Sequence, residues 1–207
     1  MAFIKQQRSE SVTKDERKKP RTCDDLVAGL EDPNPVARRW MARDLVACPG
    51  SALALVDRLK REGDTSVREV ILTTLTQIGD PTAVGGLVEC LRNGDAALRN
   101  EVIETMKQLP DAVAPIMRGL LADEDSDVRI FAVNILETLR HPEVERWLIG
   151  VVESDPQVNV CAAAADLLSE VGTEAAEGAL VRLKARFRDE PYVRFTADLA
   201  LKRIHES

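Results

Sequence analysis

Aromatic side chains and histidines are scarce in this chain. Its 207 residues contain two Trp, one Tyr, four Phe and two His, although hydrophobic residues make up 44%. The core must therefore be built from Leu, Val, Ile and Ala, and few rings are available to stack on exposed bases. No apolar run approaches the roughly 20 residues of a membrane-spanning helix. The first 22 residues lack the apolar core of a secretory signal, so we expect a cytoplasmic protein without a membrane partner.

Cysteine is sparse as well, and its four positions follow no ligand spacing. Cys23, Cys48, Cys90 and Cys161 are far apart, form no C-x-x-C pair and have no companion histidines. Such spacing predicts neither a disulfide framework nor a zinc site. We interpret all four as small buried side chains in a reducing cytosol.

Negative charge predominates, but it is unevenly distributed. The net charge is −7, whereas residues 1–22 hold seven basic and three acidic residues, so this segment carries +4 and the remainder −11. The acidic remainder argues against nucleic acid as the main partner, because neutralising phosphates needs Lys and Arg. Residues 1–22 are predicted to be a flexible basic arm, or alternatively a tether to an acidic partner or to the chain's own acidic body. Residues 23–207 then form the folded domain.

An internal repeat dominates the rest of the chain. Blocks such as GDTSVREVILTTLTQIGD (63–80) and EDSDVRIFAVNILETLRH (124–141) are variants of one unit. Spacings of 31, 31, 30, 30 and 35 residues separate its landmark apolar residue, which falls at Val36, Val67, Leu98, Val128, Val158 and Val193. A nearly fixed period of this size is typical of helical solenoids. About six two-helix repeats without strand signals predict an all-α, right-handed superhelix.

Acid–base pairs recur at the start of the second helix of each repeat. An acidic residue is followed four positions later by arginine, the favourable order near a helix N-terminus. The pairs are Asp64 with Arg68, Asp95 with Arg99, Asp125 with Arg129, and Glu190 with Arg194. We interpret them as a structural ladder that can also bond the neighbouring loop when repeats stack.

The pattern D-x-x-V-R followed by small residues resembles HEAT-like repeats, in particular the short kind of about 30 residues associated with phycobilisome lyase subunits. The resemblance covers residues 23–204 and implies an α–α solenoid. It implies no single function, because one fold hosts many activities.

Chemistry-bearing motifs are missing. His141 and His205 are isolated, and the sequence has no Gly-rich phosphate loop, nucleophile elbow or metal-ligand cluster. We therefore expect no catalytic residue, metal or cofactor, and interpret the chain as a monomeric, non-enzymatic scaffold or adaptor that binds another protein on its concave face. Two alternatives stay open: an accessory subunit of a bilin lyase-like maturation enzyme, and a nucleic-acid-binding HEAT-like protein.

The position two residues after each landmark is expected to face the concave side. It is occupied by Glu69, Asn100, Ile130, Val160 and Phe195. The last three are apolar, which predicts an exposed docking stripe in the C-terminal half, with Phe195 as its anchor. The alternative is that these three side chains pack between neighbouring second helices.

Overall fold

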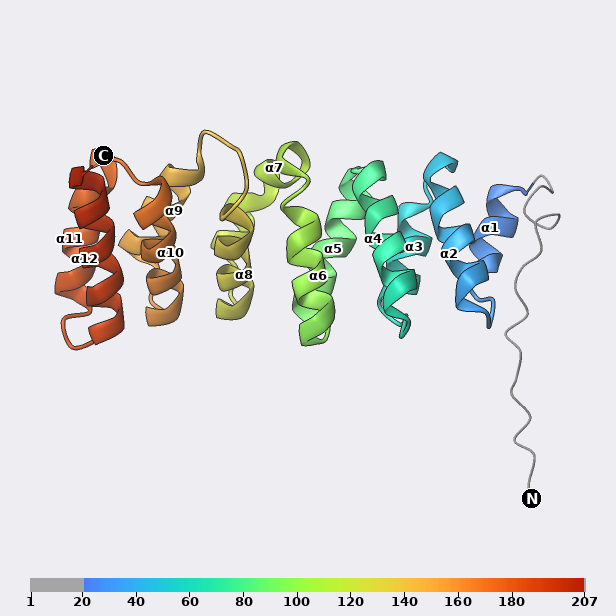
Figure 1. The fold of residues 1–207 in the computed structure, drawn as a ribbon, viewed down its shortest axis with the longest axis horizontal. Coiled ribbons are helices and arrows are strands. Elements are labelled where there is room, and N and C mark those ends of the chain that lie inside the picture. Colours follow the sequence, from blue (N-terminus) through green and yellow to red (C-terminus); the bar gives the residue numbers. More distant parts are fainter. Residues whose placement is uncertain (1–20, 207) are drawn as a thin grey trace, which may run out of the picture. The chain divides into compact units, whose positions relative to one another are not determined.

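The computed structural model describes residues 21–206, and these are helical without strands, as the repeat predicts. The described residues form two compact units, one ending at Cys90 and the other beginning at Leu91. Each unit is built from pairs of antiparallel helices (Figure 1). The predicted basic arm lies outside the described residues, except for Arg21 and Thr22.

The N-terminal unit contains four helices, one 3₁₀ turn and most of a fifth helix. They are α1 (Cys23–Gly29), α2 (Pro35–Asp44), η2 (Leu45–Ala47), α3 (Ala52–Leu59), α4 (Thr65–Ile78) and α5 (Pro81–Asn93), whose last residues pass into the next unit. Thr22 and Asp25 form a capping box at the start of α1, so Thr22 belongs to the folded part rather than to the arm. A Cβ at Gly86 would lie 2.2 Å from Val56, so glycine allows α5 to approach α3 closely.

The C-terminal unit continues with α6 (Ala96–Met106), α7 (Pro110–Leu121), α8 (Ser126–Leu136), α9 (Val144–Ser154), α10 (Val158–Val171), η3 (Glu174–Ala176), α11 (Glu177–Arg186) and α12 (Pro191–Glu206). The second helices α8, α10 and α12 stand in a row (Figure 1), and α7, α9 and α11 form the layer of first helices. Aliphatic side chains such as Met117, Ile135 and Leu168 fill the space between the layers.

In each second helix, the landmark is the third residue after the N-cap. Val67, Leu98, Val128 and Val193 hold this position and are buried. The predicted landmarks Val36 and Val158 are wrong, because Asn34 and Gln157 are the N-caps of α2 and α10. Ala37 and Val160 therefore take the buried position, and the true spacings are 30, 31, 30, 32 and 33 residues.

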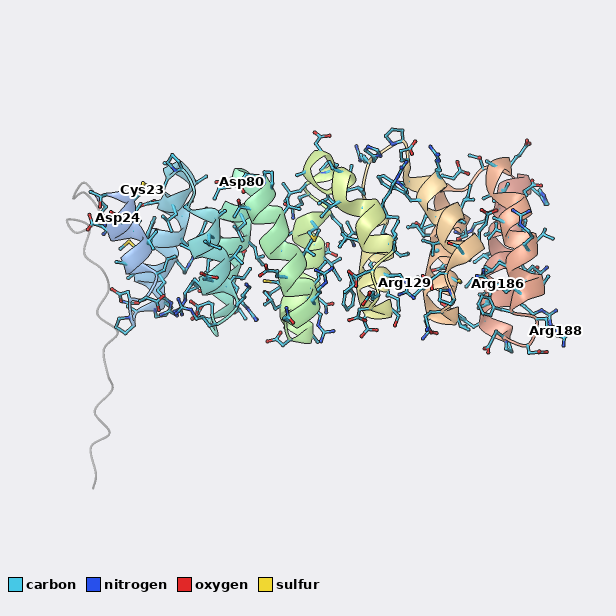
Figure 2. All side chains as sticks on the ribbon, turned by 180° about the vertical axis from the view of Figure 1, so that it is seen from behind. Cys23, Asp24, Asp80, Arg129, Arg186 and Arg188 are labelled. Carbon is cyan, nitrogen blue, oxygen red and sulfur yellow. A yellow bond between two sulfur atoms is a disulfide. The ribbon has the colours of Figure 1, made fainter. Side chains whose placement is uncertain are left out.

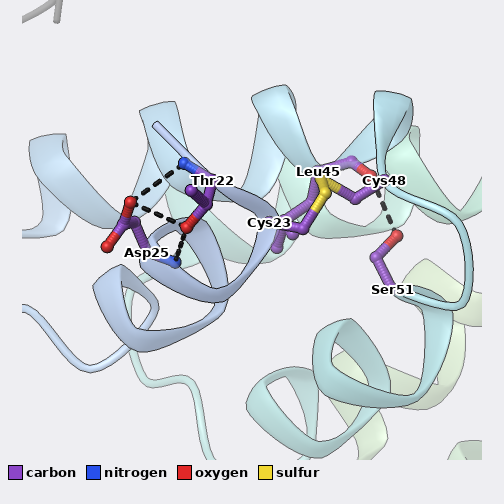
Figure 3. Close-up of a disulfide and its surroundings, with 6 residues drawn as sticks. All are labelled: Thr22, Cys23, Asp25, Leu45, Cys48 and Ser51. Carbon is purple, nitrogen blue, oxygen red and sulfur yellow. Dashed lines mark hydrogen bonds between the residues drawn. A yellow bond between two sulfur atoms is a disulfide. The ribbon is translucent and has the colours of Figure 1, made fainter. Parts of the chain in front are cut away.

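The interpretation of all four cysteines as free thiols is wrong for two of them. Cys23 at the start of α1 and Cys48 after η2 form a disulfide, with their Cα atoms 5.7 Å apart (Figure 3). The fold brings together residues that lie 25 positions apart, and no sequence spacing announces this. Cys90 and Cys161 are free and buried, as expected.

Candidate functional site

The residue after the landmark is an arginine in most second helices, and two of these arginines join consecutive repeats. Arg129, labelled in Figure 2, donates to both carboxylate oxygens of Asp155, at 2.7 and 3.1 Å, and to the carbonyl of Asp123 at 2.8 Å. Arg38 does the same in the N-terminal unit, with two bonds of 2.8 Å to Glu62 and one to the carbonyl of Asp32. Each guanidinium therefore fixes the loop before its own helix and the loop of the next repeat.

Three of the four acidic members of the predicted ladder cap their own helices. The side chains of Asp64, Asp95 and Asp125 accept backbone N–H groups of the first helical turn. For Arg129 the carboxylate within bonding distance is that of Asp155 in the next repeat and not that of Asp125. The short aspartate side chain folds back onto the helix start, and this geometry explains the difference.

The remaining ladder residues have other surroundings. Arg68 is buried, and Arg99 donates to the carbonyl of Gly94 at 2.9 Å. Glu190 and Arg194 are both exposed at the start of α12.

Cys161 occupies the arginine position in α10, and an arginine from the next repeat compensates for it. Arg186, in the last turn of α11 and labelled in Figure 2, donates to the carbonyls of Val152 and Asp155 at 3.0 Å and to the sulfur of Cys161 at 3.0 Å. Burial raises the pKa of the Cys161 thiol, which keeps it protonated, and the thiol donates to the carbonyl of Asp155. The C-terminal carbonyls of α9 are thereby satisfied.

A buried carboxylate lies at the corresponding place in the N-terminal unit. The side chain of Glu62 is 1% exposed and accepts hydrogen bonds from Arg38, Arg58 and the backbone N–H of Asp64. Burial by itself would raise the pKa of Glu62, but the two guanidinium groups and the backbone bond outweigh it and lower the pKa to about 2. This ionised network is structural, because every oxygen is engaged by the protein.

The predicted docking stripe is only partly on the surface. Glu69 and Asn100 are exposed, Ile130 is half-buried, and Phe195 is 62% exposed. Val160 is fully buried, so its place in the stripe is wrong. The reason is the register of α10: with Gln157 as N-cap, Val160 takes the core position, and Ala162, itself buried, takes the stripe position.

A groove that the sequence did not indicate lies between α8, α10 and α12. We call it the second-helix groove; it has a volume of about 240 Å³ and is lined by Asn134, Glu137, Asp166, Leu167, Glu170 and Tyr192, among others. Three of these residues are acidic, and Tyr192 is 62% exposed at its edge. Phe195 lies one turn further along α12 and is equally exposed. The groove therefore presents carboxylates beside the accessible ring of Tyr192, and the accessible ring of Phe195 follows one turn along α12.

The groups that usually support catalysis are dispersed. His141 stacks on Trp147 with ring centroids 4.9 Å apart. His205, near the end of α12, lies 3.1 Å from the carboxylate of Glu177 in α11. Between residues 21 and 206, no three His, Cys, Asp or Glu side chains are placed to hold a metal ion. Within the same residues, no helix is long and apolar enough to cross a membrane.

Comparison with known proteins identifies the repeat. The family of HEAT repeats matches residues 52–128 and 113–202, more than half of the chain. No curated protein matches the sequence. An engineered protein of known crystal structure is 21% identical, with 89% of this chain and 96% of that chain covered and a TM-score of 0.41. The complex of CpcE and CpcF of phycocyanin lyase from Nostoc sp. PCC7120 is 17% identical, with 98% and 100% covered and a TM-score of 0.37. The expected resemblance is confirmed by the family match: the chain belongs to the HEAT repeat family.

Proposed function

We propose that this chain is a non-enzymatic protein-binding module whose partner docks on the second-helix groove. The observation that supports it is that Tyr192 and Phe195, one turn apart on α12, are both 62% exposed, and that Tyr192 lines the acidic groove. Exposed aromatic side chains on a soluble repeat protein are typical anchors of a protein partner. Stacked helical repeats offer extended surfaces of the kind that such partners use.

Charge defines the chemistry of the partner. Glu137, Asp166 and Glu170 line the groove, and Lys107 pairs with Glu137 from its rim at 2.7 Å. Asp166 and Glu170 are exposed one turn apart on α10. A complementary partner segment therefore carries Lys or Arg together with an apolar side chain for the two rings. The same carboxylates would repel a phosphate backbone, which argues against nucleic acid as the occupant of this groove.

The test compares two double variants as bait in a native lysate. Tyr192→Ser with Phe195→Ser removes both rings, whereas Leu53→Ser with Val181→Ser removes two side chains that are exposed elsewhere. We expect a partner protein that the wild type and the Leu53→Ser, Val181→Ser control capture, and that the Tyr192→Ser, Phe195→Ser variant does not. The purified partner should bind the Tyr192→Ser, Phe195→Ser variant at least tenfold more weakly than the wild type. Equal capture by both variants would refute docking on this groove.

A further inference from the structure

A second groove lies in the layer of first helices, between α7 and α9. We call it the arginine groove; it measures about 520 Å³ and is lined by Arg118, Leu121, Arg146, Trp147, Gly150 and Pro156, among others. The space beside Gly150 is open, because a Cβ added there would meet no atom within 4 Å. A neighbouring hollow shares Arg118 and Trp147 with this groove and is also lined by His141, Glu143 and Asp111. An apolar wall and two basic side chains thus share one recess.

Most charges of this groove are already neutralised within the protein. Asp155 is held by the buried Arg129, and Asp123 pairs with Arg92. Asp111 lines the neighbouring hollow. Arg118 and Arg146, by contrast, have side chains that are 70% and 73% exposed. They are the accessible charges at the opening.

Both exposed guanidiniums approach the same carboxylate oxygen. Arg118 lies 3.5 Å and Arg146 3.3 Å from Oε2 of Glu143. These distances are long for charge-assisted hydrogen bonds, so Glu143 holds the two arginines loosely. The arrangement demonstrates that one carboxylate oxygen fits between them.

We propose that the arginine groove binds an acidic peptide segment, with a glutamate or aspartate carboxylate of the ligand between Arg118 and Arg146. Its apolar side chains would lie against Trp147, Leu121 and Pro156. Glu143 then acts as an internal competitor that occupies the arginine pair in the free protein. The proposal does not depend on the second-helix groove, which is acidic and lies in the other helix layer.

Trp147 provides a direct readout of occupancy. Its indole N–H is buried and has no hydrogen-bond partner, and the ring lines the groove. A carboxylate that enters beside the ring changes the field at the indole and so changes its emission. Trp40→Phe leaves Trp147 as the remaining tryptophan of the chain.

The experiment titrates hexaglutamate into the full chain carrying Trp40→Phe, at low salt, and follows tryptophan fluorescence and calorimetry. Hexaglutamine and pyrophosphate are the comparison ligands. We expect saturable binding of hexaglutamate but not of hexaglutamine. The double variant Arg118→Gln, Arg146→Gln should weaken hexaglutamate binding by about tenfold or more. The control variant Arg182→Gln, Arg188→Gln removes the same amount of charge outside the groove and should leave hexaglutamate binding unchanged.

Two further variants separate a binding site from general attraction. Glu143→Gln removes the competitor and should tighten hexaglutamate binding. Gly150→Leu should abolish binding by filling the groove, whereas Gly119→Leu, at an open position outside the lining, should not. Equal weakening by both arginine pairs, or no effect of Glu143→Gln, would overturn the proposal. Binding of pyrophosphate alone through Arg118 and Arg146 would also overturn it, because the groove would then be a phosphate site.

Discussion

Val160 and Phe195 hold the same predicted stripe position in their repeats but differ in burial. Val160 is fully buried in the core, whereas Phe195 is 62% exposed. Val160→Ser should lower the free energy of unfolding by about 2–4 kcal/mol, because it leaves a cavity and buries a hydroxyl. Phe195→Ser should change it by about 0.5 kcal/mol or less. Denaturant unfolding of both variants measures the contrast, and equal losses would contradict the assigned register.

A second residue-scale prediction concerns the buried carboxylate of Glu62. Its pKa in the folded protein is about 2, below its ordinary value of 4.5, because Arg38, Arg58 and a backbone N–H outweigh burial. A folded-state pKa below the unfolded value stabilises the protein fully above about pH 4.5. This stabilisation is lost as the pH falls toward 2. We expect it to amount to about 3 kcal/mol.

The measurement is the difference in unfolding free energy between wild type and Glu62→Gln as a function of pH. Hydrogen bonds also lower the pKa of Glu31, Asp64 and Asp123, so the wild type alone would not isolate Glu62. The difference should be largest at neutral pH, where Arg38 and Arg58 lose a buried partner in the variant. It should shrink between about pH 5 and pH 2. A difference that is constant with pH would contradict the ionised network.

At the scale of helices, the disulfide ties the first helix to the turn after α2. Cys23 and Cys48 enclose a loop of 25 residues, and a crosslink of this span stabilises the folded state by about 3 kcal/mol. Cys23→Ser with Cys48→Ser, or a reductant, should lower the unfolding free energy by about that amount. A Cys90→Ala variant should keep the full response to reductant. Identical stability with and without reductant would show that the pair is not bonded.

Helix boundaries also show what the sequence could predict. The second helices α4, α6 and α8 begin where the predicted acid–base pairs place them, directly after Asp64, Asp95 and Asp125; these aspartates were predicted as partners of the arginines, and the structure shows that they bond the first-turn amides. In α10 the N-cap is Gln157, and Asp155 lies two residues before it, as Glu62 lies before Asp64; Asp155 accepts the backbone N–H of Gln157 as well as the bonds from Arg129. Asp155 and Val158 have the spacing that separates cap and landmark in the other repeats, so the sequence pattern places the landmark at Val158. The error shifted Val160 from the core to the predicted stripe.

The candidate grooves were beyond prediction for a related reason. The second-helix groove joins residues from 133 to 192 on three helices, and the arginine groove joins residues from 118 to 156 on α7, α8 and α9. A period of about 30 residues identifies which residues are equivalent. It does not show where neighbouring helices leave a gap between them. The exposure of Phe195 could be predicted, because the sequence shows a large apolar residue at a surface position of the repeat.

At the scale of the whole molecule, we expect a monomer in solution. The net charge of −7 favours repulsion between copies, and two of the large exposed apolar residues, Leu53 and Val181, lie on different helices from Tyr192 and Phe195. Sedimentation velocity over a wide concentration range should give one species of 22.8 kDa. A stable dimer that survives Tyr192→Ser with Phe195→Ser would contradict this expectation.

The central claim is that a protein partner docks on the second-helix groove, and site-specific photo-crosslinking tests it most directly. The photoreactive residue p-benzoylphenylalanine replaces Phe195 in one protein and Val181, which is 56% exposed on α11, in another. Both proteins are irradiated in cells that make them, and crosslinked species are separated and identified by mass spectrometry. The account predicts a discrete crosslinked partner from position 195 and none of that species from position 181. The same species from both positions, or no crosslink from position 195, would contradict it.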